Sequence, residues 1–457
     1  MKNNSLLKNM YDILTFALPM SAGLLINMIA SFVAMMMATQ LGKLQLAAGA
    51  LAMVSFMTVM TIFATVLYAL SILISHQKSK NKSHNEIGQI VKNGYWVAML
   101  LMIPSVPFLW HIDQVLILFK QNSFVIALTH GYFHFAALTM IPLLISAVNN
   151  QFFVGIGKPR LMMITSLISL PLTLFLAYGF ILGHFGLPTL GLTGITCSIF
   201  ISQSIVCIGI LFYMNFSKYI QSYSIFTHLF KPNWALCKRI INLGLPIGVQ
   251  SGTEFGAMTI VMYFMGYFGV TALAASQIVA QYSILIMMIS LGIAQALSIV
   301  TSRAFAHNEL ALAKQYFISA NVILVLYFFM VFALFILAPD WMISIYLPAN
   351  ELSNTQLLSL TNQLFVVSGI FLLIDGIRNL LVSALRGLHD SKAPMRISAA
   401  CMWLISLPTS YFVGFTIQGG PVGLRLGFTF GFFMAALLLW WRFENKLKKY
   451  RILQDTF

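Results

Sequence analysis

Charged residues are scarce in this sequence: Asp, Glu, Lys and Arg make up 8% of the 457 residues. Soluble domains carry about a quarter charged residues, so the composition excludes the ordinary soluble globular classes. Hydrophobic residues make up 59% of the chain, and the mean hydropathy is +0.88. The composition therefore predicts an integral membrane protein, and we expect an all-α fold.

The sequence also lacks the motifs of metal, redox and nucleotide chemistry. Its four cysteines form no CxxC pair, its nine histidines form no HExxH motif, and no GxxxxGK[ST] loop is present. The YD and GxGD motifs of intramembrane aspartyl proteases do not occur around Glu254 or Asp375, the two acids inside apolar runs. We expect no cofactor, no enzymatic activity and no ATP-driven pumping by this chain alone.

Apolar runs long enough to cross a hydrocarbon core of ~30 Å recur along the chain. Six runs lie in the first half and six in the second, which predicts twelve transmembrane helices. The expected spans are 14 to 38, 46 to 75, 93 to 118, 126 to 150, 160 to 183, 190 to 214, 240 to 266, 273 to 304, 315 to 338, 357 to 385, 395 to 417 and 421 to 442. The first span is too long for a signal peptide, so we expect it to remain in the mature protein.

The two halves of the chain repeat each other. Pro19 recurs as Pro246, and the segments 46–48 and 69–72 recur as 273–275 and 296–299, all 227 positions apart. A polar linker near 215 to 238 separates the copies. We predict two pseudo-symmetric six-helix bundles, 1–225 and 226–457, as in secondary transporters that enclose a central site between repeats.

The positive charge is concentrated in alternate loops. The formal net charge is +15, and the loops on one side, with both termini, hold most of the Lys and Arg residues. The opposite loops are expected to hold only Lys43, Lys120 and Arg425. The positive-inside rule then predicts cytoplasmic termini, with anionic lipid rather than nucleic acid as the partner of the basic tail.

Two of the eleven acidic residues, Glu254 and Asp375, fall inside predicted spans. A charge near the bilayer centre costs roughly 3 kcal/mol, so such residues indicate a functional site facing an internal cavity. At 1.5 Å per residue they lie roughly 18 Å and 17 Å from the cytoplasmic surface. The pair could share a layer near the midplane, where it would suit either a proton or Na⁺.

Arg378 follows Asp375 by three residues and shares its helix face. Two interpretations remain open. In the first, Arg378 neutralises Asp375 and leaves Glu254 as the titrating group. In the second, Arg378 releases Asp375 when a substrate or ion arrives.

Uncharged polar residues mark a predicted substrate pathway. Gln277 and Gln281 are four residues apart and would line one face of the eighth span, or would only bond neighbouring helices. In the first half, the polar residues inside apolar runs are uncharged, so this half lacks an ionisable centre. They are Asn27, Asn149, Asn150 and Gln203.

In order and register, several landmarks resemble those of the multidrug and toxic compound extrusion family, especially its NorM-like branch. They are Leu18-Pro19, Leu245-Pro246, the segments 46–48 and 273–277, and the segment 386–392. The resemblance covers almost the whole chain. It implies a V-shaped pair of six-helix bundles in the bacterial cytoplasmic (inner) membrane, and export of cationic, amphipathic compounds in exchange for Na⁺ or H⁺. It also implies that Glu254 and Asp375 match the family's carboxyls in the seventh and tenth helices.

The sequence departs from the family pattern at three positions. Ala34 stands where the family commonly has an Asp in the first helix, and Ser276 replaces a His in the eighth. Arg378 has no counterpart in the pattern. These departures put coupling through an amino-terminal carboxylate in doubt and suggest an altered substrate preference.

We therefore predict a monomeric antiporter that exports small organic cations by alternating access, with Glu254 and Asp375 holding in turn the coupling ion and the substrate. The alternative is a lipid or glycolipid flippase of the same superfamily. Such a flippase would need a large basic cavity, and only Arg378 is expected to be basic inside the spans.

Overall fold

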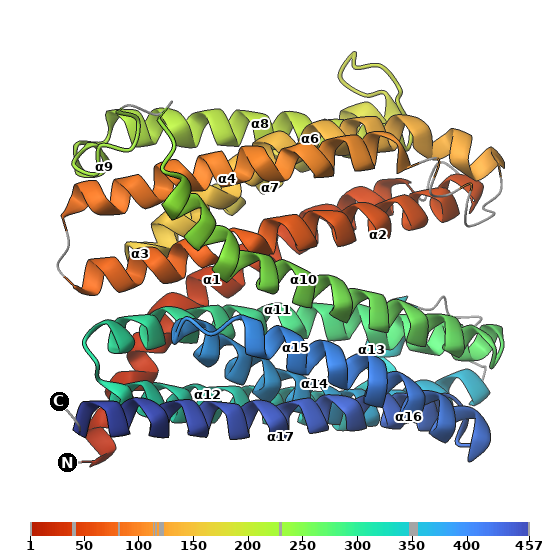
Figure 1. The fold of residues 1–457 in the computed structure, drawn as a ribbon. Helices are drawn as coiled ribbons and strands as arrows, with labels where there is room; N and C mark the ends of the chain where they lie inside the picture. The colour runs from red at the N-terminus through yellow and green to blue at the C-terminus, as the bar shows by residue number, and fades with distance from the viewer. Residues whose placement is uncertain are drawn as a thin grey trace. The chain divides into compact units, whose positions relative to one another are not determined.

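The computed structural model describes residues 2–38, 43–80, 83–112, 114, 117, 123–227, 231–346 and 355–455 (Figure 1). These residues form helices joined by short turns, and no strand occurs in the described ranges. The helices are α1 (Lys2–Ala38), α2 (Lys43–Val66), α3 (Ala69–Ser79), α4 (His84–Trp110), α6 (Ser123–Gly155), α7 (Pro159–Leu182), α8 (Thr193–Phe216), α9 (Lys218–Gln221), α10 (Trp234–Gly266), α11 (Val270–Ala306), α12 (Leu310–Leu337), α13 (Pro339–Tyr346), α14 (Thr355–Gly387), α15 (Lys392–Ala400), α16 (Leu407–Tyr411) and α17 (Gly420–Asp455).

Within the described residues, eleven helical segments are long and apolar enough to cross a membrane. The segment that does not meet this standard is α10, where Gln250, Ser251, Thr253 and Glu254 lie close together. At 33 residues, α10 is nevertheless about 50 Å long and could span the hydrocarbon core. The predicted all-α membrane fold is confirmed, and the predicted seventh span contains a polar turn.

The contacts divide the chain into two compact units. One unit comprises residues 1–21 and 249–457, and the other comprises residues 22–248. Residues 1–21 belong with the second half because α1 begins against it: Ser21 Oγ donates to the Ile289 carbonyl at 3.1 Å, and Tyr316 Oη donates to Asp12 Oδ2 at 3.4 Å. The repeat-based division at residue 225 remains a prediction. We call these parts the C-unit (1–21 and 249–457) and the N-unit (22–248).

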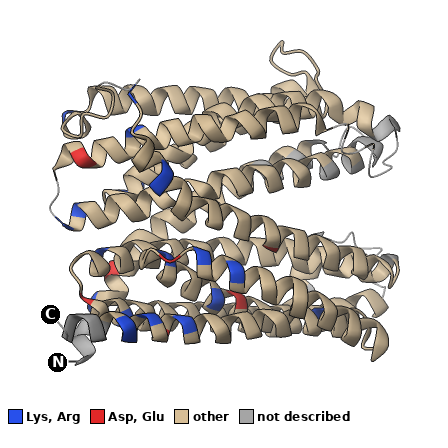
Figure 2. Ribbon diagram, in the orientation of Figure 1, with Lys and Arg blue, Asp and Glu red and all other residues tan. Residues whose placement is uncertain are grey.

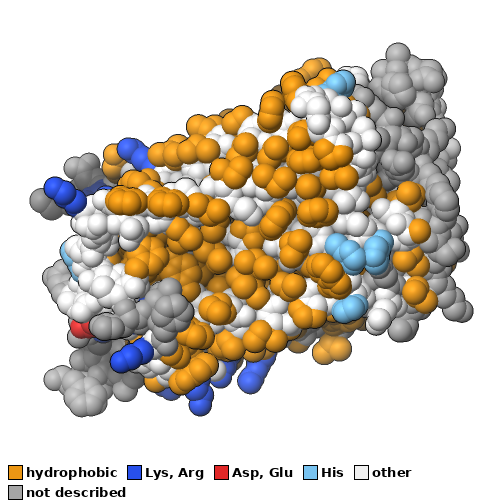
Figure 3. Space-filling model, turned by 90° about the horizontal axis from the view of Figure 1, so that it is seen from above, with side chains coloured by type: hydrophobic (Ala, Val, Ile, Leu, Met, Phe, Trp, Pro, Cys, Tyr) orange, Lys and Arg blue, Asp and Glu red, His pale blue; other side chains and the backbone are white. Residues whose placement is uncertain are grey.

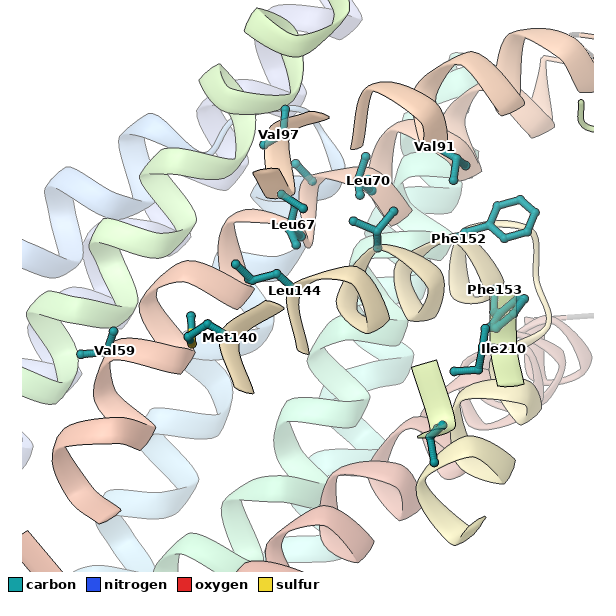
Figure 4. Close-up of a cluster of buried hydrophobic side chains, with 14 of the residues drawn as sticks. Val59, Leu67, Leu70, Val91, Val97, Met140, Leu144, Phe152, Phe153 and Ile210 are labelled. Carbon is teal, nitrogen blue, oxygen red and sulfur yellow. The ribbon is translucent and has the colours of Figure 1, made fainter. Parts of the chain in front are cut away.

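The N-unit is held together by a continuous apolar core. Side chains from α2, α3, α4, α6 and α8 meet there, among them Leu67, Leu70, Val97, Leu144 and Phe152 (Figure 4). Between α2 and α3, Leu67 and Tyr68 form a tight turn, whose amides donate to the carbonyls three residues earlier. The segment predicted as one helix from 46 to 75 is therefore interrupted, because its backbone hydrogen bonds span three residues instead of four at this turn.

In the C-unit, α17 packs closely against the membrane segment that precedes it, Lys392–Thr416. That segment joins α15 and α16 to two π-helical stretches, Cys401–Ser406 and Phe412–Thr416. A Cβ atom on Gly427 or Gly431 would lie 2.4 Å from the Thr409 carbonyl oxygen or 2.2 Å from Ser406 Cβ. Ser406 Oγ also donates to the Phe428 carbonyl at 2.7 Å. The four-residue glycine spacing thus allows the close backbone approach typical of membrane helix pairs.

The distribution of polar side chains fits a membrane protein. One face of the molecule is covered largely by hydrophobic side chains (Figure 3), as expected for a surface in contact with lipid. Within each unit, Lys and Arg lie mainly toward one end of the helices (Figure 2). This arrangement underlies the orientation that we propose below.

Candidate functional site

The two membrane acids lie inside the C-unit on different helices. Glu254 is on α10 and Asp375 is on α14, and their side chains are 16% and 2% exposed. Removing a carboxylate from water costs several kcal/mol unless charged or hydrogen-bonding partners replace the water. The structure supplies such partners for both acids.

Arg378 joins the two acids. Its Nη1 donates to Glu254 Oε1 at 2.7 Å, and its Nε and Nη2 donate to Asp375 Oδ1 at 3.0 and 2.8 Å. Glu254 and Arg378 are 124 positions apart in sequence, whereas Asp375 and Arg378 share one helix face. The sequence predicted the second contact as one of two interpretations, and the structure adds the first.

Neutral side chains complete this network. Gln250, one helical turn before Glu254, donates through Nε2 to Glu254 Oε1 at 2.8 Å and accepts from Arg386 Nη2 at 2.9 Å. Asn379 donates to Asp375 Oδ2 at 3.1 Å. Ser398 on α15 accepts from both Gln250 and Arg378. We call these residues the ion network: Gln250, Glu254, Asp375, Arg378, Asn379, Arg386 and Ser398.

Aromatic rings line one side of the ion network. The Arg378 guanidinium lies 5.0 Å from the centroid of the Phe432 ring, and Phe432 packs on Phe371 with centroids 4.9 Å apart. The Arg425 guanidinium lies 4.6 Å from the Phe371 ring centroid. Stacking of guanidinium groups on aromatic faces is favourable and excludes water. The buried charges are thus enclosed by rings as well as by hydrogen bonds.

The other predicted pathway residues lie apart from this network. Gln277 is exposed and Gln281 is half-buried on α11, and among the described residues no hydrogen bond links either to the network. In the N-unit, Asn27 Nδ2 donates to Ser166 Oγ at 3.2 Å. The Asn150 Oδ1 atom is buried and has no hydrogen-bond partner in the described part of the chain. The structure brings together Glu254, Asp375 and Arg378 only.

The described residues contain no group of three or more His, Cys, Asp and Glu side chains that could hold a metal ion. A Na⁺ site at Glu254 and Asp375 thus remains a prediction, and its ligands would have to include amide, hydroxyl or carbonyl oxygens. Ala34, which replaces the family's first-helix Asp, is fully buried in the N-unit.

Sequence reasoning misplaced Arg425 and missed Arg386 and Gln250. The expected loop position of Arg425 conflicts with the expected span 421 to 442, and in the structure α17 begins at Gly420 and Arg425 lies within the membrane segment 420–450. The expectation that only Arg378 is basic inside the spans is therefore wrong. The i, i+4 spacing of Gln250 and Glu254 is a sequence signal for their contact, because residues four apart share one face of a helix.

A second charged cluster surrounds Asp390, which lies outside the membrane segments at the turn between α14 and α15. Asp390 Oδ2 accepts from Arg442 Nη2 at 2.9 Å and lies 3.2 Å from Lys446 Nζ. Burial alone would raise the pKa of Asp390, but the neighbouring Lys446 and Arg442 outweigh burial and hold this pKa below its ordinary value. Through these contacts of Asp390, the segment 386–392 at the end of α14 is bound to α17.

The fold and the enclosed ion network define a multi-pass membrane transporter rather than an enzyme. The MatE family model matches residues 19–179 and 246–412, and these two segments begin 227 positions apart, the spacing of the internal repeat. The chain belongs to the MatE family, whose members include the NorM multidrug resistance proteins. The resemblance found from the sequence motifs is confirmed.

Individual relatives support the same assignment. The chain is 28% identical over 417 residues to a probable multidrug resistance protein NorM of Rhizobium meliloti, covering 91% of this chain and 88% of the relative. It is 26% identical to the NorM protein of Synechocystis sp., covering 95% and 94%. A crystal structure of a MATE protein in the bent conformation superposes with a TM-score of 0.86 at 17% identity, covering 97% and 96% of the two chains.

Proposed function

We propose that this chain is a secondary active exporter that exchanges small organic cations for Na⁺ or H⁺ by alternating access. Its relatives bear the name multidrug resistance protein, which supports export of varied small compounds. The coupling chemistry follows from the ion network of the C-unit. We also propose the bacterial cytoplasmic membrane as its location and cytoplasmic termini, because Lys and Arg lie mainly toward one end of the helices in each unit.

The observation that carries this proposal is the arrangement around Glu254. Both of its hydrogen bonds, from Arg378 and Gln250, fall on Oε1. Among the described residues, Oε2 has no hydrogen-bond partner, and the side chain is 16% exposed. One carboxylate oxygen of a fixed, mostly buried acid is thus left to receive a cation. Both oxygens of Asp375 accept hydrogen bonds and its side chain is 2% exposed, so Glu254 is the group that exchanges ion and substrate.

Exchange follows from competition for this oxygen. A carboxylate that holds a proton or Na⁺ loses its attraction for an organic cation, and an organic cation displaces the small ion in turn. The Phe371 and Phe432 rings beside the network are buried, so they would shield its charges from water rather than contact a substrate. Gln277, Gln281, Asn27 and Asn150 remain proposed contacts along the substrate pathway.

The test is efflux from proteoliposomes in the Glu254→Gln variant. This substitution keeps the shape of the side chain and removes the negative charge, so ion-driven efflux of a fluorescent organic cation should fall to the rate of protein-free liposomes. Glu444→Gln is the matched control, because Glu444 is also in the C-unit but pairs with Lys314 at 2.6 Å. Full activity in Glu254→Gln would refute the proposed role.

A lipid or glycolipid flippase remains the second candidate because of Arg425. Its guanidinium lies inside a membrane segment, and Nε is buried without a hydrogen-bond partner in the described residues. A donor of this kind would suit an anionic headgroup. Protein-dependent movement of a fluorescent anionic lipid between leaflets, absent in Arg425→Met and unaffected by the ion gradient, would favour this function over cation exchange.

A further inference from the structure

Arg378 has no hydrogen-bonding capacity left for a ligand. A guanidinium group has five N–H donors. Nε donates to Asp375, Nη1 donates to Glu254 and to Ser398 at 3.4 Å, and Nη2 donates to Asp375 and to Asn379 at 3.1 Å. The side chain is only 1% exposed. A residue with every donor engaged cannot also bind an anionic substrate without breaking this network.

Asp375 is equally committed. Oδ1 accepts two hydrogen bonds from Arg378, and Oδ2 accepts one from Asn379. Its side chain is 2% exposed. Both oxygens of Asp375 thus accept hydrogen bonds and are almost wholly buried, whereas Oε2 of Glu254 accepts none among the described residues.

The guanidinium occupies the position that a bound cation would take between two carboxylates. It approaches Glu254 Oε1 at 2.7 Å and Asp375 Oδ1 at 2.8 Å, and the Phe432 ring lies against it. With two acids and one guanidinium, this triad carries a net charge of −1, where the acids alone would carry −2. Arg386, which bonds Gln250 in the same network, adds a positive charge with or without Arg378, so removing Arg378 changes the charge at the two acids by one unit.

We propose that Arg378 is a tethered cation that permanently fills one of two cation places in the C-unit, so that the triad binds one exchangeable monovalent cation, at Glu254. This inference rests on the proposed exchange function and deepens it, because it fixes how many cations the site can take. It also separates the two acids by role: Glu254 exchanges ligands, and Asp375 positions Arg378.

Cation counting on the purified protein tests the proposal. Two quantities are measured per chain at one fixed pH: the radioactive Na⁺ bound at saturation, and the protons taken up from a weakly buffered solution. Choline replaces Na⁺ where Na⁺ is omitted. The sum of the two quantities is the cation count. Arg378→Met keeps the apolar stem and removes the charge. It should gain one cation per chain relative to the wild type, and Asp375→Asn in addition should abolish the gain.

Arg442→Met is the matched control, because Arg442 also pairs with a single aspartate of the C-unit, Asp390, through Nε and Nη2. It should leave the count unchanged. An Arg378→Met count equal to that of the wild type, or an equal gain in Arg442→Met, would overturn the proposal.

The double variant Asp375→Asn/Arg378→Met keeps the test decisive if Arg378→Met does not fold. It removes one charge of each sign, so the net charge of the triad is unchanged and its count must equal that of the wild type. A different count contradicts the tethered cation. Efflux by Glu254→Gln is read separately: if that variant transports normally, the exchange function fails even where the cation counts agree with this proposal.

Discussion

The two units share a repeat but differ in their interior chemistry. Asn27 and Glu254 are separated by the same 227 positions as Pro19 and Pro246, so a neutral amide in the N-unit stands where the C-unit has an acid. Asn27 donates a neutral hydrogen bond to Ser166, whereas Glu254 belongs to a network with Arg378 and Asp375. The comparison shows that one architecture can hold charge in one repeat and dispense with it in the other.

The N-unit uses hydroxyl and amide groups instead. Thr173 and Ser202 lie 2.7 Å apart, and Gln203 donates to Ser169 at 3.4 Å. Ser166, Ser169 and Thr173 lie on α7, and each is at most 5% exposed. Neutral hydrogen bonds of this kind contribute about 1 kcal/mol each, and they cannot bind a cation as a carboxylate does. Ion coupling is therefore expected from the C-unit alone.

The largest expected effect comes from removing one acid of the C-unit. Asp375 accepts two hydrogen bonds from the buried Arg378, so Asp375→Asn should cost about 2–4 kcal/mol of the free energy of unfolding. Asp375→Asn/Arg378→Met should not recover this loss, because it leaves Glu254 without its ionic partner. Unfolding in detergent, followed by circular dichroism, measures both. Equal stability of Asp375→Asn and the wild type would show that the network does not support the fold.

A smaller effect is expected at the second charged cluster of the C-unit. Lys446 and Arg442 lower the pKa of Asp390, so the ionised carboxylate stabilises the folded state. This contribution is complete above the unfolded pKa of about 3.9 and is lost as the pH falls through the lower folded pKa. Asp390→Asn should lose about 1–2 kcal/mol near neutral pH. Its stability should also change less than that of the wild type on acidification, and identical pH profiles would contradict this account.

The smallest effect is expected in the N-unit. Asn27→Ala removes a neutral amide, including its 3.2 Å hydrogen bond to Ser166, so the free energy of unfolding should fall by about 1 kcal/mol. The apparent affinity for an organic cation is expected to weaken modestly, with the dependence of efflux on the driving ion unchanged. Initial efflux rates at several ion concentrations measure this. A lost or shifted ion dependence would contradict the claim that ion coupling comes from the C-unit alone.

Much of this architecture was predictable because the repeat and the apolar runs are strong signals. Glu254 and Asp375 stood out as acids inside apolar spans, and the i, i+3 spacing predicted the contact between Asp375 and Arg378. The contact between Arg378 and Glu254 joins residues far apart in sequence, so only the packing of α10 against the other helices reveals it. Arg425 lies near the start of its helix, and the loop position expected for it was inconsistent with the expected span 421 to 442.

The most direct measurement is organic-cation movement in proteoliposomes under an imposed Na⁺ or proton gradient. The wild type should concentrate a fluorescent organic cation against its own gradient when at least one of the two ion gradients is present, and Glu254→Gln should not. Accumulation by Glu254→Gln at the wild-type level, or movement by the wild type only down the gradient of the organic cation, would contradict an exchange carried by this acid.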